Sequence, residues 1–410
     1  MNQTALAPFY QVNEQASITA PKGFIATGLH AGIRKRKRDL GVIICSVPAS
    51  AAAVYTTNAF QAAPLQVTQE NIGVDGKLQA IVVNSGVANS CTGERGIQDA
   101  RDIAKQTAQL LDIPIHQVAV ASTGVIGQFL PMEKIQTSLM KVLSIADETG
   151  GNEFAEAILT TDTLTKQVQV TMQIDGKKLT IAGVAKGSGM IHPNMATMLG
   201  FITTDAVIHA HHLQSLLWTA TDSTFNMITV DGDCSTNDSV IAMASGLAGN
   251  NSLHPHHPDW MAFQAGFTYV CQELAKKIAN DGEGATRLIE VHVAGAPTIE
   301  MARKVSKAIV GSNLVKSAVF GADANWGRIL CAAGYGDPLI RTEKVKVKLG
   351  SILVVDKGLP VFFDESKVSE ILKQETVNIF VDLQQGKQKA TAWGCDLTYE
   401  YVKINASYRT

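Results

Sequence analysis

The stretch KGSGMIHPNMATMLG, from Lys186 to Gly200, decides how the rest of this sequence is interpreted. It follows two alternating segments, QVQVTMQI and KKLTIAGVA, which Asp175-Gly176 joins as a two-residue hairpin turn. The apolar run from Met198 to Ile202 then predicts a further strand. Thr197 therefore lies at the entrance of a buried strand, after a loop that its glycines and proline allow to bend sharply.

Pattern alone leaves two interpretations of this loop open. It is a glycine-rich connection between strands, which is the common case, or it is a site where the Thr197 hydroxyl bends onto the preceding carbonyl carbon. A threonine hydroxyl is a poor nucleophile until a base removes its proton, and an N-terminal threonine carries that base in its own α-amino group. Cleavage before Thr197 would therefore create nucleophile and base together.

Length and composition describe an ordinary globular protein. The chain has 410 residues, of which 46% are apolar and 18% charged, enough for one large or two ordinary domains. A formal charge of −2 gives no reason to expect nucleic acid or an anionic membrane as partner. The six cysteines are scattered without a Cys-x-x-Cys spacing, which argues against a zinc ribbon or a disulfide framework. Without a signal peptide or a membrane-length run, we expect a cytoplasmic protein.

Short apolar strands alternate with amphipathic helices, which predicts α/β layers. The expected strands are 41–46, 78–83, 117–121, 227–230, 288–293, 344–355 and 377–383, and the expected helices are 97–111, one opened by Pro131, 212–225 and 260–278, the last with Gly282 as its C-cap. Two charged stretches are expected to be loops, the basic one a solvated loop and the acidic one a polar turn with Asx hydrogen bonds. In the basic run Ile33–Arg38 anion binding is the alternative, and for Asp231, Asp233 and Asp238 the alternative to a polar turn is a cation site.

Seven strings, spread along essentially the whole chain, carry a family resemblance. They are KGSGMIHPNMATML, NSGVANSCTG (84–93), STGVIG (122–127), TTDT (160–163), NDGEGATR (280–287), GADANWGR (321–328) and the final NASYRT. Together they resemble the ornithine acetyltransferase family, the glutamate N-acetyltransferases of arginine biosynthesis. The resemblance implies self-cleavage between Ala196 and Thr197 into an alpha chain, 1–196, and a beta chain, 197–410, that stay together as a heterotetramer of two alpha and two beta chains. It also implies a layered α/β/α fold like that of self-processing N-terminal-nucleophile amidases.

The resemblance also implies roles for individual residues. Thr197 is the nucleophile, and Thr123 and Gly124 form the oxyanion hole. The substrate-binding positions correspond to Thr163, Lys186, Thr197, Glu283, Asn405 and Thr410. Their types suit an acetylated amino acid, because Lys186 can meet a carboxylate, Glu283 the ornithine ammonium, and Asn405 an amide. Taken alone, STGVIG is equally a strand-ending turn, and a lysine or glutamate beside glycine is by default solvated.

The expected reaction is a two-step acetyl transfer from N2-acetyl-L-ornithine to L-glutamate through an acetyl-Thr197 enzyme, with no metal or redox cofactor. Some members of the family also accept acetyl-CoA as donor, and the sequence leaves this activity open. Two alternatives remain. One is a self-cleaving N-terminal-threonine amidase or aminopeptidase that uses water as acceptor, and the other is a non-catalytic metabolite-binding protein with a structural glycine loop.

Overall fold

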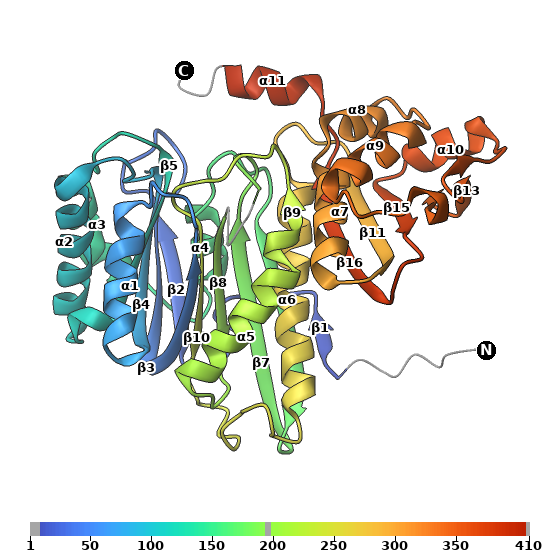
Figure 1. The fold of residues 1–410 in the computed structure, drawn as a ribbon. Coiled ribbons are helices and arrows are strands. Elements are labelled where there is room, and N and C mark those ends of the chain that lie inside the picture. Colours follow the sequence, from blue (N-terminus) through green and yellow to red (C-terminus); the bar gives the residue numbers. More distant parts are fainter. Residues whose placement is uncertain (1–8, 193–197, 407–410) are drawn as a thin grey trace. The chain divides into compact units, whose positions relative to one another are not determined.

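The predicted hairpin before the glycine-rich loop is present as strands β6 (Lys166–Ile174) and β7 (Lys177–Lys186). The computed structural model of the chain describes residues 9–192 and 198–406 (Figure 1). Asp175 and Gly176 have φ values of 52° and 70°, both in the left-handed region that a type I′ turn requires. The turn therefore fixes the register in which β6 and β7 pair.

Strands alternate with helices through most of the described residues, which confirms the α/β class. The other strands are β1 (Gln11–Asn13), β2 (Phe24–Leu29), β3 (Leu40–Tyr55), β4 (Lys77–Val87), β5 (Val118–Val125), β8 (Leu199–Thr204), β9 (Ile228–Thr229), β10 (Ser239–Ala244), β11 (Leu288–Ala296), β12 (Lys346–Leu349), β13 (Ile352–Asp356), β14 (Leu359–Pro360), β15 (Thr376–Asp382) and β16 (Gln388–Cys395). The α-helices are α1 (Ala63–Asp75), α2 (Gly93–Leu111), α3 (Met132–Ser144), α4 (Gly151–Ala157), α5 (Ala210–Ser223), α6 (Trp260–Asn280), α7 (Ile299–Gly311), α8 (Asn313–Phe320), α9 (Trp326–Gly336), α10 (Glu365–Leu372) and α11 (Tyr399–Ala406). Single turns of 3-10 helix are η1 (Ile115–Gln117), η2 (Phe225–Met227) and η3 (Thr342–Lys344).

The chain divides into two compact units. The first holds the described residues within 1–187, 194–222 and 234–274, and the second those within 188–193, 223–233 and 275–410. These boundaries do not follow the Ala196–Thr197 bond. The expected division into chains 1–196 and 197–410 concerns cleavage and stays a prediction.

The first unit contains a nine-stranded sheet whose main path runs β1-β6-β7-β8-β10-β3-β4-β5, with β2 paired to β3. Strand β8, predicted to follow Thr197, is entirely buried and pairs antiparallel with β7 and parallel with β10. Leu199 at its start lies opposite Lys186 of β7 and Ser239 of β10. The end of β7 and the start of β10 therefore flank the residues that follow Thr197.

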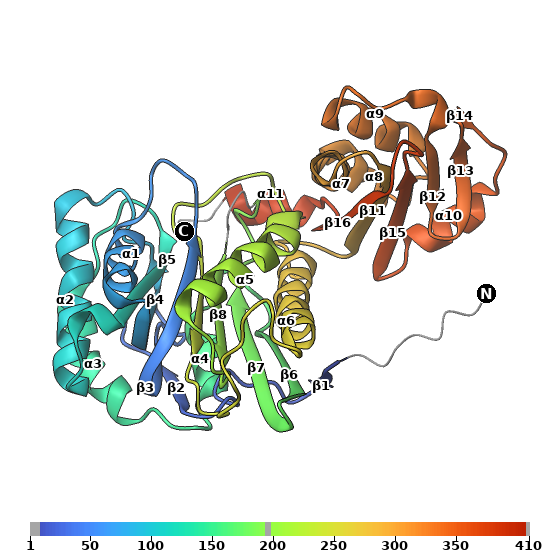
Figure 2. The ribbon, with the colours of Figure 1, turned by 60° about the horizontal axis from the view of Figure 1, so that its bottom comes forward.

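Helices cover both faces of this sheet (Figure 2). On one face, Phe154 of α4 contacts Phe201 of β8 edge to face, with 5.5 Å between the ring centroids. The other face packs against α1, α2 and α3 through a second apolar cluster. Helix α6 lies close over Gly183 of β7, where an added Cβ would come within 2.7 Å of Leu274. The layered α/β/α arrangement is thus confirmed in the first unit.

The second unit contains a seven-stranded sheet in the order β14-β13-β12-β15-β11-β16-β9. Helix α7 packs against β16, where Val310 lies next to Gly394. On the opposite face the rings of His292 and Phe380 stack at 4.7 Å, beside an open hollow of about 740 Å³. Strands 344–355 were predicted as one segment, but Gly350, with a φ of 55°, turns the chain there and separates β12 from β13.

Two loop predictions need correction. Gly282 is not among the residues with a left-handed φ, and it does not cap α6; an added Cβ there would lie 2.6 Å from the Cys395 sulfur. In the basic run, Arg34 donates to the carbonyls of Leu159 and Thr160 at 2.7 and 3.1 Å, so this side chain anchors a loop rather than facing only solvent. Both errors arise because side-chain contacts between distant segments leave no local sequence pattern.

Within residues 9–192 and 198–406, none of the helices combines the length and the apolar character that crossing a membrane requires.

Candidate active site

Thr123 and Gly124 lie at the end of β5, where this strand meets β4. Thr123 is buried, and its register partners are Ser85 and Val87. Gly124 has a φ of 131°, and an added Cβ would lie 2.2 Å from the carbonyl carbon of Gly86. Glycine is therefore required here by backbone packing between the two strands, whether or not its N–H also takes part in catalysis.

Buried amide side chains hold this strand end in place. The Ser122 hydroxyl donates to Oδ1 of Asn84 at 2.5 Å, and Nδ2 of Asn84 donates to the Val87 carbonyl at 2.8 Å. Asn237 comes from the loop before β10, and its Nδ2 donates to the carbonyls of Ala88 and Ser122 at 2.6 and 2.8 Å. Asn237 thus ties the oxyanion-hole candidates to the strand that flanks the start of β8.

Lys186 is the last residue of β7 and is half-buried, with Nζ 3.5 Å from the Thr160 hydroxyl. The segment beside it is organised by Asp162, whose carboxylate accepts the N–H of Gly187 at 2.6 Å and that of Thr160 at 3.0 Å. Nζ of Lys166 donates to the same carboxylate at 2.7 Å, and both side chains are almost completely buried. The pair therefore fixes the backbone at Gly187, next to Lys186, and at Thr160, whose hydroxyl lies near Nζ of Lys186.

Charge determines the protonation state of Asp162. Burial alone would raise the pKa of this carboxyl, but the charges of Lys166 and Lys186, with the hydrogen bonds from Lys166 and Gly187, lower it to about 2. Asp162 is therefore ionised at neutral pH. An ionised carboxylate between two ammonium groups leaves this corner of the unit positively charged, which suits an anionic substrate group.

Asp238 is a second buried carboxyl in this part of the unit, at 3% exposure. It directly precedes Ser239, the residue opposite Leu199, and its Oδ2 has no hydrogen-bond partner among the described residues. Burial raises the pKa of Asp238 well above the ordinary value, an effect that the charge of Lys186 only partly offsets. The polar turn expected over Asp231, Asp233 and Asp238 therefore has a buried carboxyl at its third aspartate.

In the second unit, Glu283 and Asn405 lie together. Glu283 is buried, and Nδ2 of Asn405, on α11, donates to its carboxylate at 2.7 Å. The N–H of Glu283 donates to the Ser188 carbonyl at 2.9 Å. An added Cβ on Gly189 would lie 2.4 Å from the Glu283 carboxyl carbon. The Gly-Ser-Gly segment thus packs against a predicted substrate-binding carboxylate, which explains its small residues.

Asp231 shapes the residues that lead toward the predicted cleavage bond. Its carboxylate accepts the backbone N–H groups of Met190 and Ile191 at 2.6 and 2.8 Å, and that of Asp233 at 3.2 Å. The last of these is the Asx-type bond expected of a polar turn. Next along the chain, Nδ1 of His192 lies 2.9 Å from the Thr229 hydroxyl. Burial and the charge of Lys307 lower the pKa of His192 to about 4, so the ring is neutral at pH 7.

The predicted site residues therefore fall into four groups. Thr123, Gly124 and Lys186 lie in the first unit on strand ends linked by Asn237 and β8, and Glu283 contacts Asn405 in the second. Thr163 is exposed in the loop before β6. Ala196, Thr197 and Thr410 lie outside the described residues. Sequence reasoning missed Asp162, although it lies in the string TTDT, and Lys166, whose only signal was its spacing of four residues from Asp162. It also missed Asn237, for which there was no signal.

Comparison with known proteins gives consistent matches. The sequence model of the ArgJ family matches residues 25–410. The arginine biosynthesis bifunctional protein ArgJ of Geobacillus kaustophilus is 56% identical over 394 residues, which is 96% of each chain. The protein of the same name from Halalkalibacterium halodurans is 54% identical over 398 residues, 97% of each chain.

Two solved structures also match. One is the crystal structure of arginine biosynthesis bifunctional protein argJ from Bacillus halodurans, at 53% identity and a TM-score of 0.45, covering 46% of this chain and 98% of that chain. The other is ornithine acetyltransferase complexed with ornithine from Mycobacterium tuberculosis, at 38% identity and a TM-score of 0.43, covering 46% of this chain and 100% of that chain.

Proposed function

This chain belongs to the ArgJ family, and we propose that it transfers the acetyl group of N2-acetyl-L-ornithine to L-glutamate in arginine biosynthesis. The family resemblance drawn from the sequence is confirmed, and with it the assignment as an acyltransferase. The observation that carries the proposal is 56% identity, over 96% of both chains, to an arginine biosynthesis bifunctional protein ArgJ. The reactants themselves come from the resemblance of the seven strings.

The proposed reaction uses Thr197 twice. In maturation, its hydroxyl attacks the Ala196 carbonyl and the C–N bond breaks, which leaves an ester on Oγ and frees the Thr197 amine. Water then hydrolyses the ester, which separates the chains with a carboxylate on Ala196 and a free hydroxyl on Thr197. In catalysis, that amine takes the hydroxyl proton while Oγ attacks the acetyl carbonyl of acetylornithine, and ornithine leaves with the proton on its α-amine. The α-amine of glutamate then attacks the acetyl ester and leaves as N-acetylglutamate, which restores the Thr197 hydroxyl.

Both half-reactions develop an oxyanion on the attacked carbonyl oxygen, for which we assign Thr123 and Gly124 as donors. The buried network of Asn84, Ser122 and Asn237 supports this assignment, because a preorganised donor pair must not move as the charge develops. Lys186 is proposed to meet the substrate carboxylate.

Glu283 is proposed to meet the ornithine side-chain ammonium, with Asn405 as its hydrogen-bonded neighbour. Thr163, Thr197 and Thr410 complete the proposed substrate-binding set.

Three further statements belong to the proposal. Acetyl-CoA serves as a second donor to glutamate, a reading supported by the word bifunctional in the relatives' names. The cleaved chains assemble as two alpha and two beta chains in the cytoplasm. The scheme uses no metal or redox cofactor, since the threonine amine supplies the base.

Cleavage is tested first, by denaturing electrophoresis and N-terminal sequencing of the purified protein. We expect fragments of residues 1–196 and 197–410, and an uncut chain in Thr197→Ala. Intact-mass measurement after mixing with acetylornithine alone should show one acetyl group on the 197–410 fragment. A single uncut chain in fully active protein would rule out the amine as base, and acetate released in place of N-acetylglutamate would indicate an amidase.

A further inference from the structure

Histidines gather in one place in the first unit, at two stretches that repeat one pattern. Residues 208–212 read Ile-His-Ala-His-His and residues 253–257 read Leu-His-Pro-His-His, and together they hold six of the ten histidines of the chain. An isolated parallel bridge between Ile208 and Leu253 joins the stretches at equivalent positions. The repeated pattern is thus brought into register by the fold, although it lies in two stretches far apart in the sequence.

Four of the imidazole rings form a continuous row. The ring centroids of His209 and His211 are 6.0 Å apart, those of His211 and His212 are 3.7 Å apart, and those of His212 and His254 are 6.2 Å apart. Two imidazoles bound to one tetrahedral cation have centroids roughly 5 Å apart, given metal–nitrogen bonds of about 2.0 Å. The observed separations bracket this value, and binding one ion requires the side chains to rotate until the nitrogens of neighbouring rings converge on it.

The row offers imidazole nitrogens that protein carboxylates do not occupy. His211 and His212 lie in the first turn of α5. In the described part of the chain, none of these four rings forms an ion pair with a carboxylate. Because Zn²⁺, Ni²⁺ and Cu²⁺ accept imidazole nitrogen as a ligand, a cation of this class suits the row better than an anion does.

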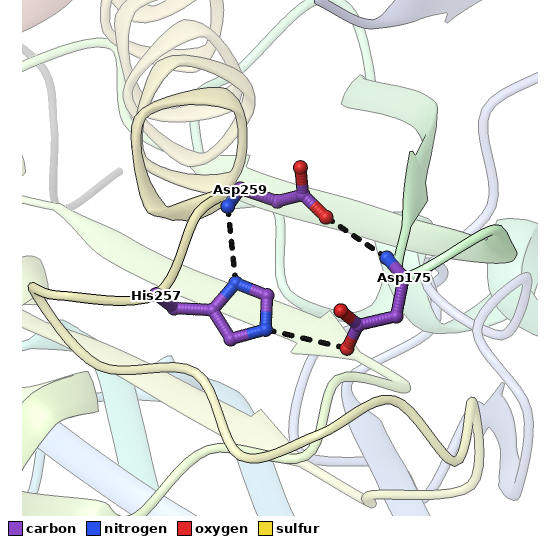
Figure 3. Close-up of side chains that lie close together, drawn as sticks. All are labelled: Asp175, His257 and Asp259. Atoms are coloured by element: carbon purple, nitrogen blue, oxygen red, sulfur yellow. Dashed lines mark hydrogen bonds and ion pairs between the residues drawn. The ribbon is translucent and has the colours of Figure 1, made fainter.

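A neighbouring group is a less suitable metal site, although its atoms are closer together. Asp175, His257 and Asp259 offer three ligand atoms within 4.8 Å of one another. Figure 3 shows them joined in a ring: the Asp259 N–H donates to Nδ1 of His257 at 3.0 Å, and Nε2 of His257 lies 3.3 Å from the Asp175 carboxylate. Both ring nitrogens of His257 are therefore engaged by protein groups, whereas His254 has one such bond, from the His256 N–H to Nδ1 at 3.2 Å, which a metal ion can replace. This ring therefore fastens the β6–β7 turn to the start of α6.

We propose that His209, His211, His212 and His254 form a surface binding site for a divalent transition-metal ion of the Zn²⁺, Ni²⁺ and Cu²⁺ class. These cations prefer imidazole nitrogen, whereas Mg²⁺ and Ca²⁺ prefer oxygen ligands. His209 and His211 are exposed and His212 and His254 half-buried, so the rings have room to turn. The site takes no part in the acetyl transfer proposed above and stands independently of it.

The test is a calorimetric titration of the tag-free, mature protein with ZnCl₂ and, separately, MgCl₂. We expect about one Zn²⁺ per chain and no Mg²⁺ binding. His211→Asn with His212→Asn should weaken Zn²⁺ binding at least about tenfold, since even groups that only orient ligands contribute 10- to 100-fold. The matched control is His30→Asn with His116→Asn, two solvent-accessible histidines on other elements, which should bind Zn²⁺ like the wild type.

A second double variant controls for local misfolding of the first one. His209→Asn with His254→Asn removes one ring from each stretch and should also weaken Zn²⁺ binding at least about tenfold. In the wild type, Cu²⁺ electron paramagnetic resonance should show nitrogen hyperfine coupling. The proposal is overturned if the wild type binds no Zn²⁺, if both double variants bind it unchanged, or if the loss appears equally in the His30/His116 control.

Discussion

The ammonium of Lys166 lies 2.7 Å from the carboxylate of Asp162, and both side chains are almost completely removed from solvent. The same carboxylate accepts the N–H of Gly187, so the ion pair holds the backbone at the point where β7 ends beside Lys186. A buried ion pair affects stability mainly when one of its two members is removed. Loss of one member leaves an uncompensated charge in the interior.

Asp162→Asn should therefore lower the stability of the first unit by on the order of 3–5 kcal/mol, the usual cost of breaking a buried pair. The change is expected as a lower thermal midpoint in scanning calorimetry. Glu70→Gln is a matched control, because Glu70 pairs with Arg101 at 3.0 Å with both side chains more than half exposed. That variant should change stability by less than about 1 kcal/mol. Equal midpoints for the two variants would contradict the role of Asp162.

Asp238→Asn should change how stability depends on pH. The pKa of Asp238 is raised above 3.8 in the folded protein, so the folded state holds its proton where the unfolded state has lost it. Folding of the wild type is therefore penalised increasingly as pH rises from about 4 toward the folded pKa, and the asparagine variant escapes this penalty. The denaturation midpoint of Asp238→Asn, measured relative to that of the wild type, should therefore rise as the pH is raised from 5 to 8. A constant difference across that range would mean that Asp238 is ionised when folded.

Thr123→Ala tests the proposed oxyanion hole. A donor that acts only on transition-state charge should lower kcat by about 10²–10³ when lost, with a much smaller change in KM. Because the Thr123 N–H remains, kcat is expected to fall by a factor within or somewhat below that range. The measured kcat must be normalised to the fraction of chains that have been cleaved. Ser85→Ala is the control, since Ser85 is the register partner of Thr123 but donates to the Ala157 carbonyl. A change in KM alone would make Thr123 a ground-state contact.

Glu283→Gln should separate the two substrates. Of the two, only acetylornithine has a side-chain ammonium, so losing the carboxylate charge should raise KM for acetylornithine about 10- to 100-fold and change KM for glutamate far less. Glutamine keeps an oxygen for the hydrogen bond from Asn405, which limits the structural damage. Steady-state kinetics with each substrate varied in turn gives the two constants. Equal effects on both would place Glu283 away from the ammonium.

Local rules of chain geometry were enough to predict several strands and turns of this protein from its sequence. Alternation of apolar residues and an Asp-Gly turn specify the β6–β7 hairpin, because both operate over a few neighbouring residues. The strand after Thr197 follows from an apolar run of the right length, and the family follows from seven strings in order. The same strings gave the candidate site residues. In the fold, Thr123, Gly124 and Lys186 lie at strand ends, Glu283 lies in a loop and Asn405 lies on α11.

Long-range packing determines which polar side chains are buried and which partners they have. Asn237 reaches the carbonyl of Ser122 across 115 residues of sequence, and no local pattern encodes such a contact. Asp231 and Asp238 lie in one acidic loop, yet the first binds backbone N–H groups, and the second is buried with one oxygen that has no hydrogen-bond partner among the described residues. The physical reason is that desolvation and charge pairing depend on every atom packed around a group. Residue type and spacing specify only the group itself.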